Sequence, residues 1–425
     1  MDASTRLNKI SEDAMCIGCG LCQSITPDNK IKLVLQPDGF ERPIANQNLT
    51  DADVDRVYRT CPSTTLRANN NASQNDLVWG SFEEIYLSFA VDPQIRHLGS
   101  TGGLLTALSL YLLETGLVDF ILHARQHRLH ASFGEATISR SREQVIDAAG
   151  SRYGPTATLI NIDETIEDTL KANERFVFIG TPCDVTALRN YALESPTVDE
   201  TCLAMMTMVC GGFMDTVSLS AFLSDLGIKA TDVATIRYRG LGCPGDTVIR
   251  MKDGEERRFT YLDFWGEDDS VWGLPARCKI CPDGIGEAAD IAASDTWDGG
   301  SPTVASLDSD PGTNAALVRT ERGKAIMDGA IKAGYLTRGD NLTPQDMSRF
   351  QPHQENKKRT LKARLDALRS AGQLTPETHD LRLAALDATL SDADRAREYE
   401  GTTRRIEQNR FSEPTPQPCA KRSKT

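Results

Sequence analysis

Residues 175–189, RFVFIGTPCDVTALR, show how a strand, a turn and a helix follow one another in this chain. The aromatic and β-branched start predicts a buried strand, the Gly-Thr-Pro turn ends it, and an aspartate lies in the first turn of the helix that follows. A second apolar strand is predicted over residues 203–209 and runs directly into Cys210. Cys183 and Cys210 are therefore expected at the carboxyl ends of successive strands, which share one edge of a parallel sheet.

The same order of elements occurs earlier in the chain. A strand is predicted over residues 84–90, a glycine turn over 99–103, an apolar helix over 104–113 and another strand over 117–122. A strand, a helix and a second strand in this order form the unit of a parallel α/β sheet. The expected fold class is therefore α/β in the central part of the chain and α+β overall.

The segment before this sheet carries three cysteines at the spacing of an iron–sulfur loop. Cys16, Cys19 and Cys22 form C-x2-C-x2-C, which is typical of bacterial ferredoxins. Thr26 stands where that motif has its fourth cysteine, so Cys61, which precedes a proline, is the expected fourth ligand. Zinc loops usually pair two cysteines per knuckle, and we therefore favour a [4Fe–4S] cluster over zinc.

A second set of four cysteines is predicted from the sheet topology. The pair Cys278-x-x-Cys281 alone suits a zinc knuckle or a dithiol equally well. Cys183 and Cys210 at the sheet edge complete a four-thiolate site, for which Cys243 competes. We favour Cys183 over Cys243 because the positive end of a helix dipole stabilises a thiolate. The sequence thus predicts two [4Fe–4S] clusters.

The turn at residues 99–103, GSTGG, is a candidate nucleotide site. It offers small side chains, two hydroxyls and free amides at the start of a helix, although it lacks a Walker lysine and the G-x-G-x-x-G spacing. One-electron clusters beside a nucleotide site suggest a flavin. The stretch 152–155, RYGP, could bring a cation and an aromatic ring to it. The candidate flavin contacts are Ser100, Thr101, Gly102, Gly103, Arg152, Tyr153 and Gly154.

Composition narrows the class of protein. The 425 residues contain eleven cysteines and carry a net charge of -13. This charge repels phosphate backbones, so nucleic acid is not an expected partner. The sequence has no apolar run of membrane-spanning length and its start is not a secretory signal, so we expect a cytoplasmic protein that does not bind a membrane. Cysteines in a reducing compartment favour metal or redox chemistry over disulfides.

Four parts are predicted along the chain. After Pro352 the sequence becomes helical, with leucines at i, i+4 and i+7, and Thr375-Pro376 predicts the start of a further helix. The predicted parts are a ferredoxin-like iron–sulfur segment (1–75), a parallel α/β flavin domain (76–230), a β and loop region for cluster and substrate binding (231–350), and a helical tail (351–425).

Six separated motifs resemble one known family. GSTGG, SRYGP, IGTPCD, the strand-ending Cys210, YRGLGCPG and RCKICPDGIGEAADIAASDTW occur in the order found in the beta-subunit family of coenzyme F420-reducing hydrogenases and dehydrogenases. That family also includes 7-hydroxymethyl chlorophyll a reductase and a ferredoxin-dependent divinyl chlorophyllide 8-vinyl reductase. The resemblance runs from about Cys16 to Trp297 and does not cover the tail.

The resemblance implies an FAD-binding domain with iron–sulfur clusters that exchange electrons with the flavin. Thr181 of the IGTPCD motif becomes a further candidate cofactor contact, and Cys183, Cys210, Cys278 and Cys281 become the cluster ligands common to the family. We expect an enzyme that passes electrons from ferredoxin through two clusters to FAD and reduces a small organic substrate. The alternatives are a coenzyme F420-dependent subunit of a larger complex and a zinc-stabilised binding protein. The sequence leaves homo-oligomerisation and the substrate open.

Overall fold

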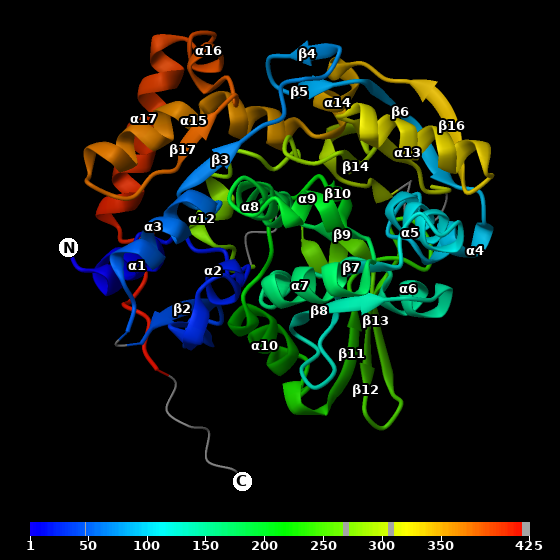
Figure 1. Cartoon of the computed structure of the whole chain (residues 1–425), viewed down its shortest axis with the longest axis horizontal. Coiled ribbons are helices and arrows are strands. Elements are labelled where there is room, and N and C mark those ends of the chain that lie inside the picture. The colour runs from blue at the N-terminus through cyan, green and yellow to red at the C-terminus, as the bar shows by residue number, and fades with distance from the viewer. Residues whose placement is uncertain (47, 267–271, 305–309, 419–425) are drawn as a thin grey trace.

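The computed structural model describes residues 1–46, 48–266, 272–304 and 310–418. Its centre is an eight-stranded sheet in the order β16-β6-β15-β14-β10-β9-β7-β8 (Figure 1). The strands are β6 (Glu84–Ala90), β7 (Phe120–Gln126), β8 (Gly134–Ser139), β9 (Phe176–Gly180), β10 (Cys202–Met208), β14 (Ile291–Asp295), β15 (Asn314–Val318) and β16 (Leu336–Asn341). The neighbours β7, β9, β10 and β14 run parallel, and the strands outside them pair antiparallel.

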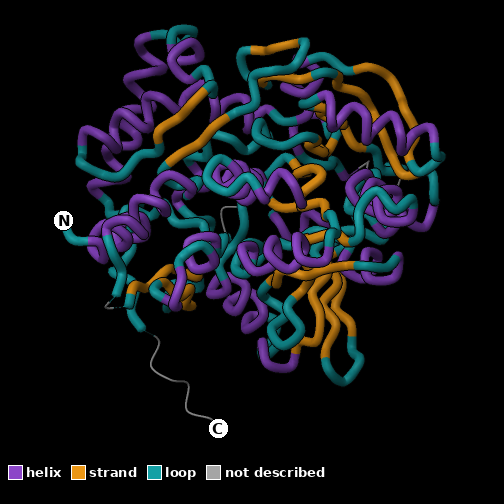
Figure 2. The backbone as a smooth tube through the Cα atoms, viewed as in Figure 1, coloured by secondary structure: helices purple, strands orange, loops and turns teal. Residues whose placement is uncertain are grey.

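Alternating side chains of the central strands serve two different cores. In β9, Val177 packs into one core and its neighbours Phe176 and Phe178 into another on the opposite face, because successive strand residues point to opposite faces. Helices cover both faces, as the helix and strand colours of Figure 2 show. The helices that pack against the sheet are α5 (Leu104–Glu114), α6 (Arg142–Ala148) and α13 (Glu321–Lys332) in the first core, and α7 (Ile162–Ala172), α8 (Pro182–Ala192) and α9 (Thr197–Thr201) in the second.

The expected α/β class is confirmed, and the sheet is mixed rather than parallel throughout. β9 and β10 are adjacent and parallel with Gly180 opposite Thr207, so their carboxyl ends share one edge as predicted. β6 and β7 were expected to form one parallel unit, but four strands lie between them, and β6 pairs antiparallel with β15 and β16. The hydrophobic pattern marks both strands but does not specify their neighbours.

A small antiparallel sheet stands beside the main one. It contains β11 (Val233–Arg237), β12 (Thr247–Met251) and β13 (Glu256–Phe259). Its apolar core also includes residues of the neighbouring helices. These helices are α10 (Thr216–Asp225) and α11 (Tyr261–Trp265). The expected change to β and loop structure after residue 230 is therefore seen here.

The two ends of the chain pack against each other. β3 (Thr65–Arg67) pairs with β17 (Glu377–His379), and one apolar core contains residues from both ends, among them Leu7 and Leu361 (Figure 1). The prediction that a helix begins at Thr375-Pro376 is wrong, since the strand β17 follows these residues. The four-part division of the chain stays a prediction.

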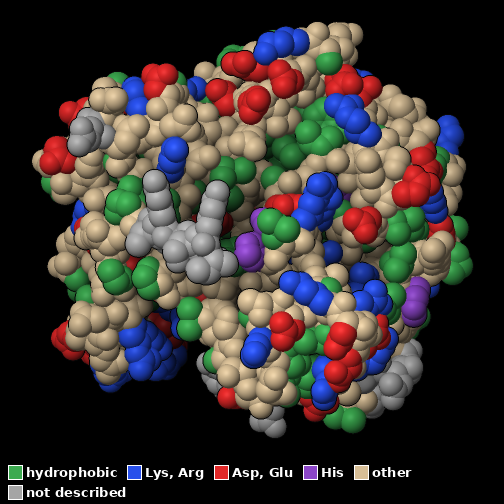
Figure 3. Space-filling view, turned by 90° about the horizontal axis from the view of Figure 1, so that it is seen from below, with side chains coloured by type: hydrophobic (Ala, Val, Ile, Leu, Met, Phe, Trp, Pro, Cys, Tyr) green, Lys and Arg blue, Asp and Glu red, His purple; other side chains and the backbone are tan. Residues whose placement is uncertain are grey.

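The remaining elements lie mainly in these terminal segments. At the N-terminal side they are α1 (Ala3–Glu12), α2 (Leu21–Ser24), β1 (Ile31–Leu35), β2 (Glu41–Ala45), α3 (Asp51–Thr60), β4 (Gln74–Asp76), β5 (Gly80–Phe82) and α4 (Pro93–Leu98). Further along they are α12 (Ala276–Lys279), α14 (Pro344–Phe350), α15 (Pro352–Ser370), α16 (Leu383–Asp387) and α17 (Asp392–Glu407). In the described part of the chain, no helix combines the length and the apolar character needed to cross a bilayer. Acidic and basic side chains are intermixed on the face shown in Figure 3.

Candidate cysteine and cofactor sites

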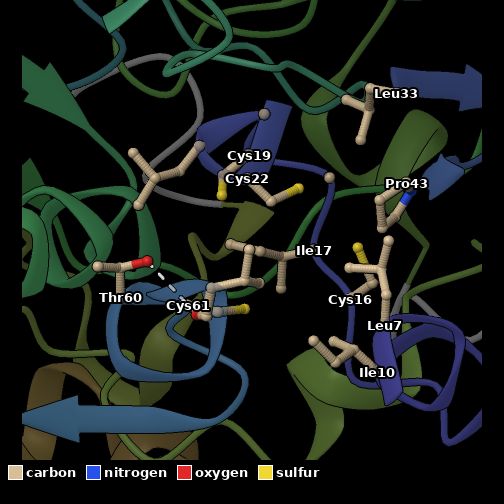
Figure 4. A pocket seen from close by; sticks show the side chains of 14 residues that line it. Leu7, Ile10, Cys16, Ile17, Cys19, Cys22, Leu33, Pro43, Thr60 and Cys61 are labelled. Atoms are coloured by element: carbon tan, nitrogen blue, oxygen red, sulfur yellow. Dashed lines mark hydrogen bonds between the residues drawn. The ribbon is translucent and has the colours of Figure 1, made fainter. Parts of the chain in front are cut away.

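The first predicted cysteine set surrounds one apolar cavity, which we call the outer cysteine site. Cys16 and Cys19 lie in the loop between α1 and α2, Cys22 lies in α2, and Cys61 caps the C-terminus of α3. All four line the same cavity together with apolar side chains such as Ile17. Figure 4 shows Cys19 and Cys22 on one side of this space and Cys16 and Cys61 on two others. The structure thus brings together the four residues that the sequence predicts as one ligand set.

Two glycines allow the cysteine loop to turn this tightly. Gly18 and Gly20 have φ angles of 73° and 86°, which side chains other than glycine rarely adopt. A Cβ on Gly20 would lie 2.8 Å from the Cα of Ile160. The amide of Leu159 also donates to the carbonyl of Cys19 at 2.9 Å. The loop is therefore held against the segment that precedes α7.

The outer thiols are buried, and burial determines their protonation. It raises the pKa of Cys16 to about 11 and the pKa of Cys19, Cys22 and Cys61 above the ordinary value. Unligated thiols here are therefore protonated at neutral pH. Four thiols in an apolar pocket fit an iron–sulfur cluster, whose iron compensates the charge of the thiolates. Within the described residues, no three histidine, cysteine or acidic side chains are arranged to hold a single metal ion.

The second predicted cysteine set also comes together, and we call it the inner cysteine site. Cys183 lies in the first turn of α8, Cys210 follows β10, Cys278 lies in α12 and Cys281 comes shortly after it. Burial raises the pKa of Cys183, as do the charges of Asp184, Cys210 and Cys281. Burial, Cys278 and Cys281 raise the pKa of Cys210 to about 12. A Cβ on Gly212, two residues after Cys210, would lie 3.6 Å from the Sγ atom of Cys278, and the amide of Cys281 donates to the carbonyl of Cys278 at 3.4 Å. These contacts and the mutual electrostatic effects place the four side chains near one another.

Cys243, the competitor for the inner site, lies elsewhere. It lines a separate cavity of about 300 Å³ together with Asp246, Arg258 and Asp310. Burial and the Asp310 carboxylate raise its pKa. The structure therefore places Cys183, and not Cys243, with the other three inner cysteines.

Two contacts link the outer and inner sites. Burial raises the pKa of the Cys19 thiol most, followed by the charge of Cys61 and then by that of Asp184, the neighbour of Cys183. Burial also raises the pKa of Asp184 itself to about 6. In addition, the Arg277 guanidinium donates to the carbonyl of Pro62 at 3.0 Å. The two cysteine sites are thus adjacent in space although they come from distant segments.

The glycine turn at residues 99–103 packs against the first residue of β15. A Cβ on Gly102 would lie 2.8 Å from Oδ1 and 2.9 Å from the backbone nitrogen of Asn314. The same Oδ1 accepts from the amide of Leu104 at 3.3 Å, and Nδ2 of Asn314 donates to the Thr101 hydroxyl at 3.0 Å. Gly102 is therefore required by packing within the protein. A substitution at this position would disturb the turn itself and would not test nucleotide binding alone.

Two partly buried arginines beside this turn have no ion-pair partner among the described residues. A Cβ on Gly150 would lie 3.3 Å from Nη2 of Arg237 and 3.5 Å from Nη1 of Arg152, so both guanidinium groups approach one point. Burial and the charge of Arg237 lower the pKa of Arg152 to about 10. The Nε atoms of both arginines are buried without a hydrogen-bond partner. Ser100 and Ser151 lie nearby, with their hydroxyls 2.8 Å apart. Nη1 of Arg152 donates to the carbonyl of Ser151 at 3.1 Å, and Nη2 of Arg237 donates to the carbonyl of Leu98. The two unpaired charges and the Nε donors without a partner fit an anionic group.

A third arginine orders the same region. Arg239 donates to the Asp295 carboxylate at 3.0 Å and to the carbonyl of Ser100 at 2.9 Å. Nη1 of Arg239 also donates to the hydroxyl of Tyr153 at 3.3 Å. The sequence analysis missed Arg237 and Arg239 as candidate cofactor contacts, although the two arginines on either side of Tyr238 are a visible signal.

Two other predicted cofactor contacts, Gly154 and Thr181, pack against or lie close to other residues of the protein. Gly154 leaves room for the carbonyl of Ser132, which would lie 1.9 Å from a Cβ at this position. The Thr181 hydroxyl lies 3.0 Å from the Sγ atom of Cys183. Thr181 therefore belongs to the surroundings of the inner cysteine site, while the other candidate contacts lie around the turn or pack near it.

Fold and sites together define a mixed α/β protein with two four-cysteine sites and two neighbouring arginines, Arg152 and Arg237, which we call the arginine pair. Residues 85–162 match the N-terminal model, and residues 173–341 the C-terminal model, of the coenzyme F420 hydrogenase/dehydrogenase beta subunit. The two matches cover more than half of the chain. The chain belongs to the coenzyme F420 hydrogenase/dehydrogenase beta subunit family, which confirms the resemblance seen in the sequence motifs.

Individual relatives agree with this family. The chain is 27% identical over 261 residues to the beta subunit of F420-dependent formate dehydrogenase 1 from Methanococcus maripaludis, and the match covers 60% of each chain. It is 22% identical to the beta subunit of coenzyme F420 hydrogenase from Methanothermobacter thermautotrophicus, with 61% of this chain and 85% of the relative covered. A match to the coenzyme F420-dependent sulfite reductase of Methanocaldococcus jannaschii is also 22% identical and covers 83% of this chain and 52% of that protein.

A solved structure shows the same fold. A chain of the F420-reducing [NiFe] hydrogenase complex from Methanosarcina barkeri aligns with a TM-score of 0.52 and 20% identity. The alignment covers 69% of this chain and 96% of that chain. The inner cysteine site and the glycine turn lie inside the residues matched by the family models, whereas the outer cysteine site lies before them.

Proposed function

We propose that this protein is an iron–sulfur flavoprotein subunit that transfers electrons between coenzyme F420 and a partner protein. One observation carries the proposal: eight cysteines from separate segments form two adjacent four-thiol sites, and two arginines without an ion-pair partner among the described residues approach one point beside the glycine turn. When bound, FAD would exchange a hydride with F420 and single electrons with the clusters. The names of the relatives favour this F420 alternative over the ferredoxin-dependent reductase expected from the sequence.

The arginine pair supports a dinucleotide such as FAD. Arg152 and Arg237 have no ion-pair partner among the described residues and their Nε atoms have no acceptor, so a diphosphate would supply the missing negative charge and further acceptors. Ser100 and Ser151 add hydroxyls at the same place. Arg239 is different, because Asp295 already neutralises it. We therefore assign anion binding to the first two arginines and ordering of the turn to Arg239.

The two cysteine sites support a short electron path through the protein. The inner site follows the carboxyl ends of β9 and β10, on the sheet edge where Asp295 ends β14. The outer site adjoins it through Asp184 and through the contact of Arg277 with Pro62. Cys16 and Cys19 are buried and the other six cysteines are partly buried, which limits the access of water to the clusters. A partner that receives or supplies single electrons would then dock nearer the outer site.

The test adds one of two electron donors, reduced F420 or reduced ferredoxin, to protein that was prepared anaerobically and carries its flavin and clusters. Reduced F420 is expected to bleach the flavin absorbance and then to produce the EPR signal of reduced clusters. In Arg152→Leu the bleaching should weaken because less flavin is bound. If reduced ferredoxin reduces the protein and reduced F420 does not, the F420 proposal is wrong and the ferredoxin-dependent alternative is favoured.

A further inference from the structure

Helix α15 begins directly over the inner cysteine site, although it lies beyond the residues matched by the family models. Nε2 of Gln354 donates to the carbonyl of Cys210 at 2.7 Å, and Nζ of Lys357 donates to the carbonyl of Cys278 at 3.2 Å. Gln354 and Lys357 are neighbours on one helix face because they are three positions apart. One helix thus fastens two chain segments that each supply an inner cysteine.

Lys357 brings an uncompensated positive charge to this site. It has no ion-pair partner in the part of the chain that the structure describes, and its ammonium donates one hydrogen bond there, to the carbonyl of Cys278. Burial and the neighbouring cysteines raise the pKa of Cys210 and Cys278, and the Lys357 ammonium acts on both in the opposite direction. The amino-terminal end of the 19-residue helix adds further positive potential at the same point.

The next residue anchors the helix in place. Lys358 is buried and pairs with Glu287, which also pairs with Arg382. Glu287 lies in the segment that follows the inner cysteine pair, so the network joins this segment to both the helix and the C-terminal tail. On the opposite side, Nε2 of Gln351 donates to the carbonyl of Asp295 at 3.2 Å. These contacts hold the Lys357 charge at a fixed distance from the inner site.

We propose that α15 sets the reduction potential of the cluster at the inner cysteine site, with Lys357 stabilising its reduced form and Gln354 fixing its Cys210 loop. The inference rests on the proposed function, since it requires a cluster at this site. Reduction adds a negative charge to the cluster, so a nearby fixed cation raises the potential, and net charge is one of the main determinants of cluster potential. Lys357 and Gln354 are positioning residues, because they act through the backbone and the field and not as ligands.

The test measures cluster potentials by anaerobic redox titration followed by EPR. The signal that disappears in Cys281→Ser identifies the inner cluster. Lys357→Met should shift the redox equilibrium of the inner cluster roughly tenfold toward the oxidised form. This corresponds to a reduction potential that is about 59 mV lower for a one-electron couple. Lys357→Arg should restore the wild-type potential. Lys362→Met is the matched control, because Lys362 lies on the same helix but pairs with Asp366.

Iron content separates the outcomes. A wild-type protein without an inner cluster would overturn the proposed function and this inference together. An intact inner cluster with an unchanged potential in Lys357→Met would overturn this inference alone. Loss of inner iron in Lys357→Met that is absent in Lys357→Arg would support a requirement for the positive charge.

Discussion

The outer and inner cysteine sites are built in opposite ways. Three of the four outer cysteines come from a single loop of seven residues, Cys16 to Cys22, and only Cys61 comes from elsewhere. The inner cysteines come from three separate places: Cys183 and Cys210 follow two parallel strands, and Cys278 and Cys281 lie in and just after a short helix far along the chain. The outer site therefore depends on local backbone geometry, and the inner site depends on the sheet.

This difference has consequences for stability and for function. The outer loop is fixed by two glycines and by contacts with the segment before α7. The inner site is fixed only when β9, β10 and α15 are all in place, so a substitution that disrupts the sheet or α15 directly disturbs this site. We expect each site to lose its cluster without the other, and the predictions below test this independence.

The largest expected effect is on iron content. Cys19→Ser should reduce about eight irons per chain to about four and leave flavin bound, because the outer loop and the arginine pair come from different segments of the chain. Cys281→Ser should also leave about four irons, with a different EPR signal remaining. Iron analysis and EPR of both variants check this result. If either substitution removes all the iron, the two sites do not assemble independently.

The second prediction sharpens the composition of the inner site. Cys183→Ser should lose the inner cluster, since Cys183 lies with Cys210 and Cys281. Cys243→Ser should keep all the iron, because Cys243 lines a different cavity. Labile sulfide and iron assays distinguish the two variants. The opposite pattern would move the fourth ligand to the loop of Cys243.

The third prediction concerns the arginine pair, Arg152 and Arg237. Arg152→Leu should weaken FAD binding roughly tenfold or more, since a charge-assisted hydrogen bond to a buried anion is lost. Arg128→Leu, an exposed arginine, is the control. Flavin titration followed by fluorescence measures both affinities. Equal FAD affinity in the two variants would show that Arg152 does not bind FAD.

The smallest expected effect is a pH dependence of the protein without its clusters. The folded protein holds the Cys16 and Cys278 thiols at a pKa of about 11, whereas an unfolded thiol titrates near 8.5. The unfolded state therefore loses protons first, and the free energy of unfolding should fall by about 1.4 kcal/mol per pH unit for each such thiol between these values. Denaturant unfolding at pH 8 and pH 10 measures the change. The cluster-loaded protein serves as the control, because ligated sulfurs do not bind protons in this range.

The sequence predicted the outer site more directly than the inner one. The C-x2-C-x2-C spacing selects its ligands without knowledge of the fold, and Cys61 was chosen for its following proline. The inner site required the additional argument that β9 and β10 end on one edge, and their parallel pairing confirms that argument. Both arguments use short-range sequence signals and one general rule about sheets.

Other features could not be predicted from the sequence. The separation of β6 from β7 by four strands depends on which strands pair, and strand periodicity carries no information about partners. Asn314 fills the space beside Gly102 from a position more than 200 residues away. The contacts of Lys357 and Gln354 with the inner site come from a helix whose own pattern shows only which face is apolar.

The central claim is that the eight clustered cysteines hold two iron–sulfur clusters beside a flavin. The most direct measurement is the content of iron, acid-labile sulfide, zinc and flavin in the wild-type protein purified under anaerobic conditions. We predict about eight irons, about eight sulfides and one FAD per chain. Zinc bound at the cysteine sites without labile sulfide would contradict the account and favour the zinc-stabilised binding protein.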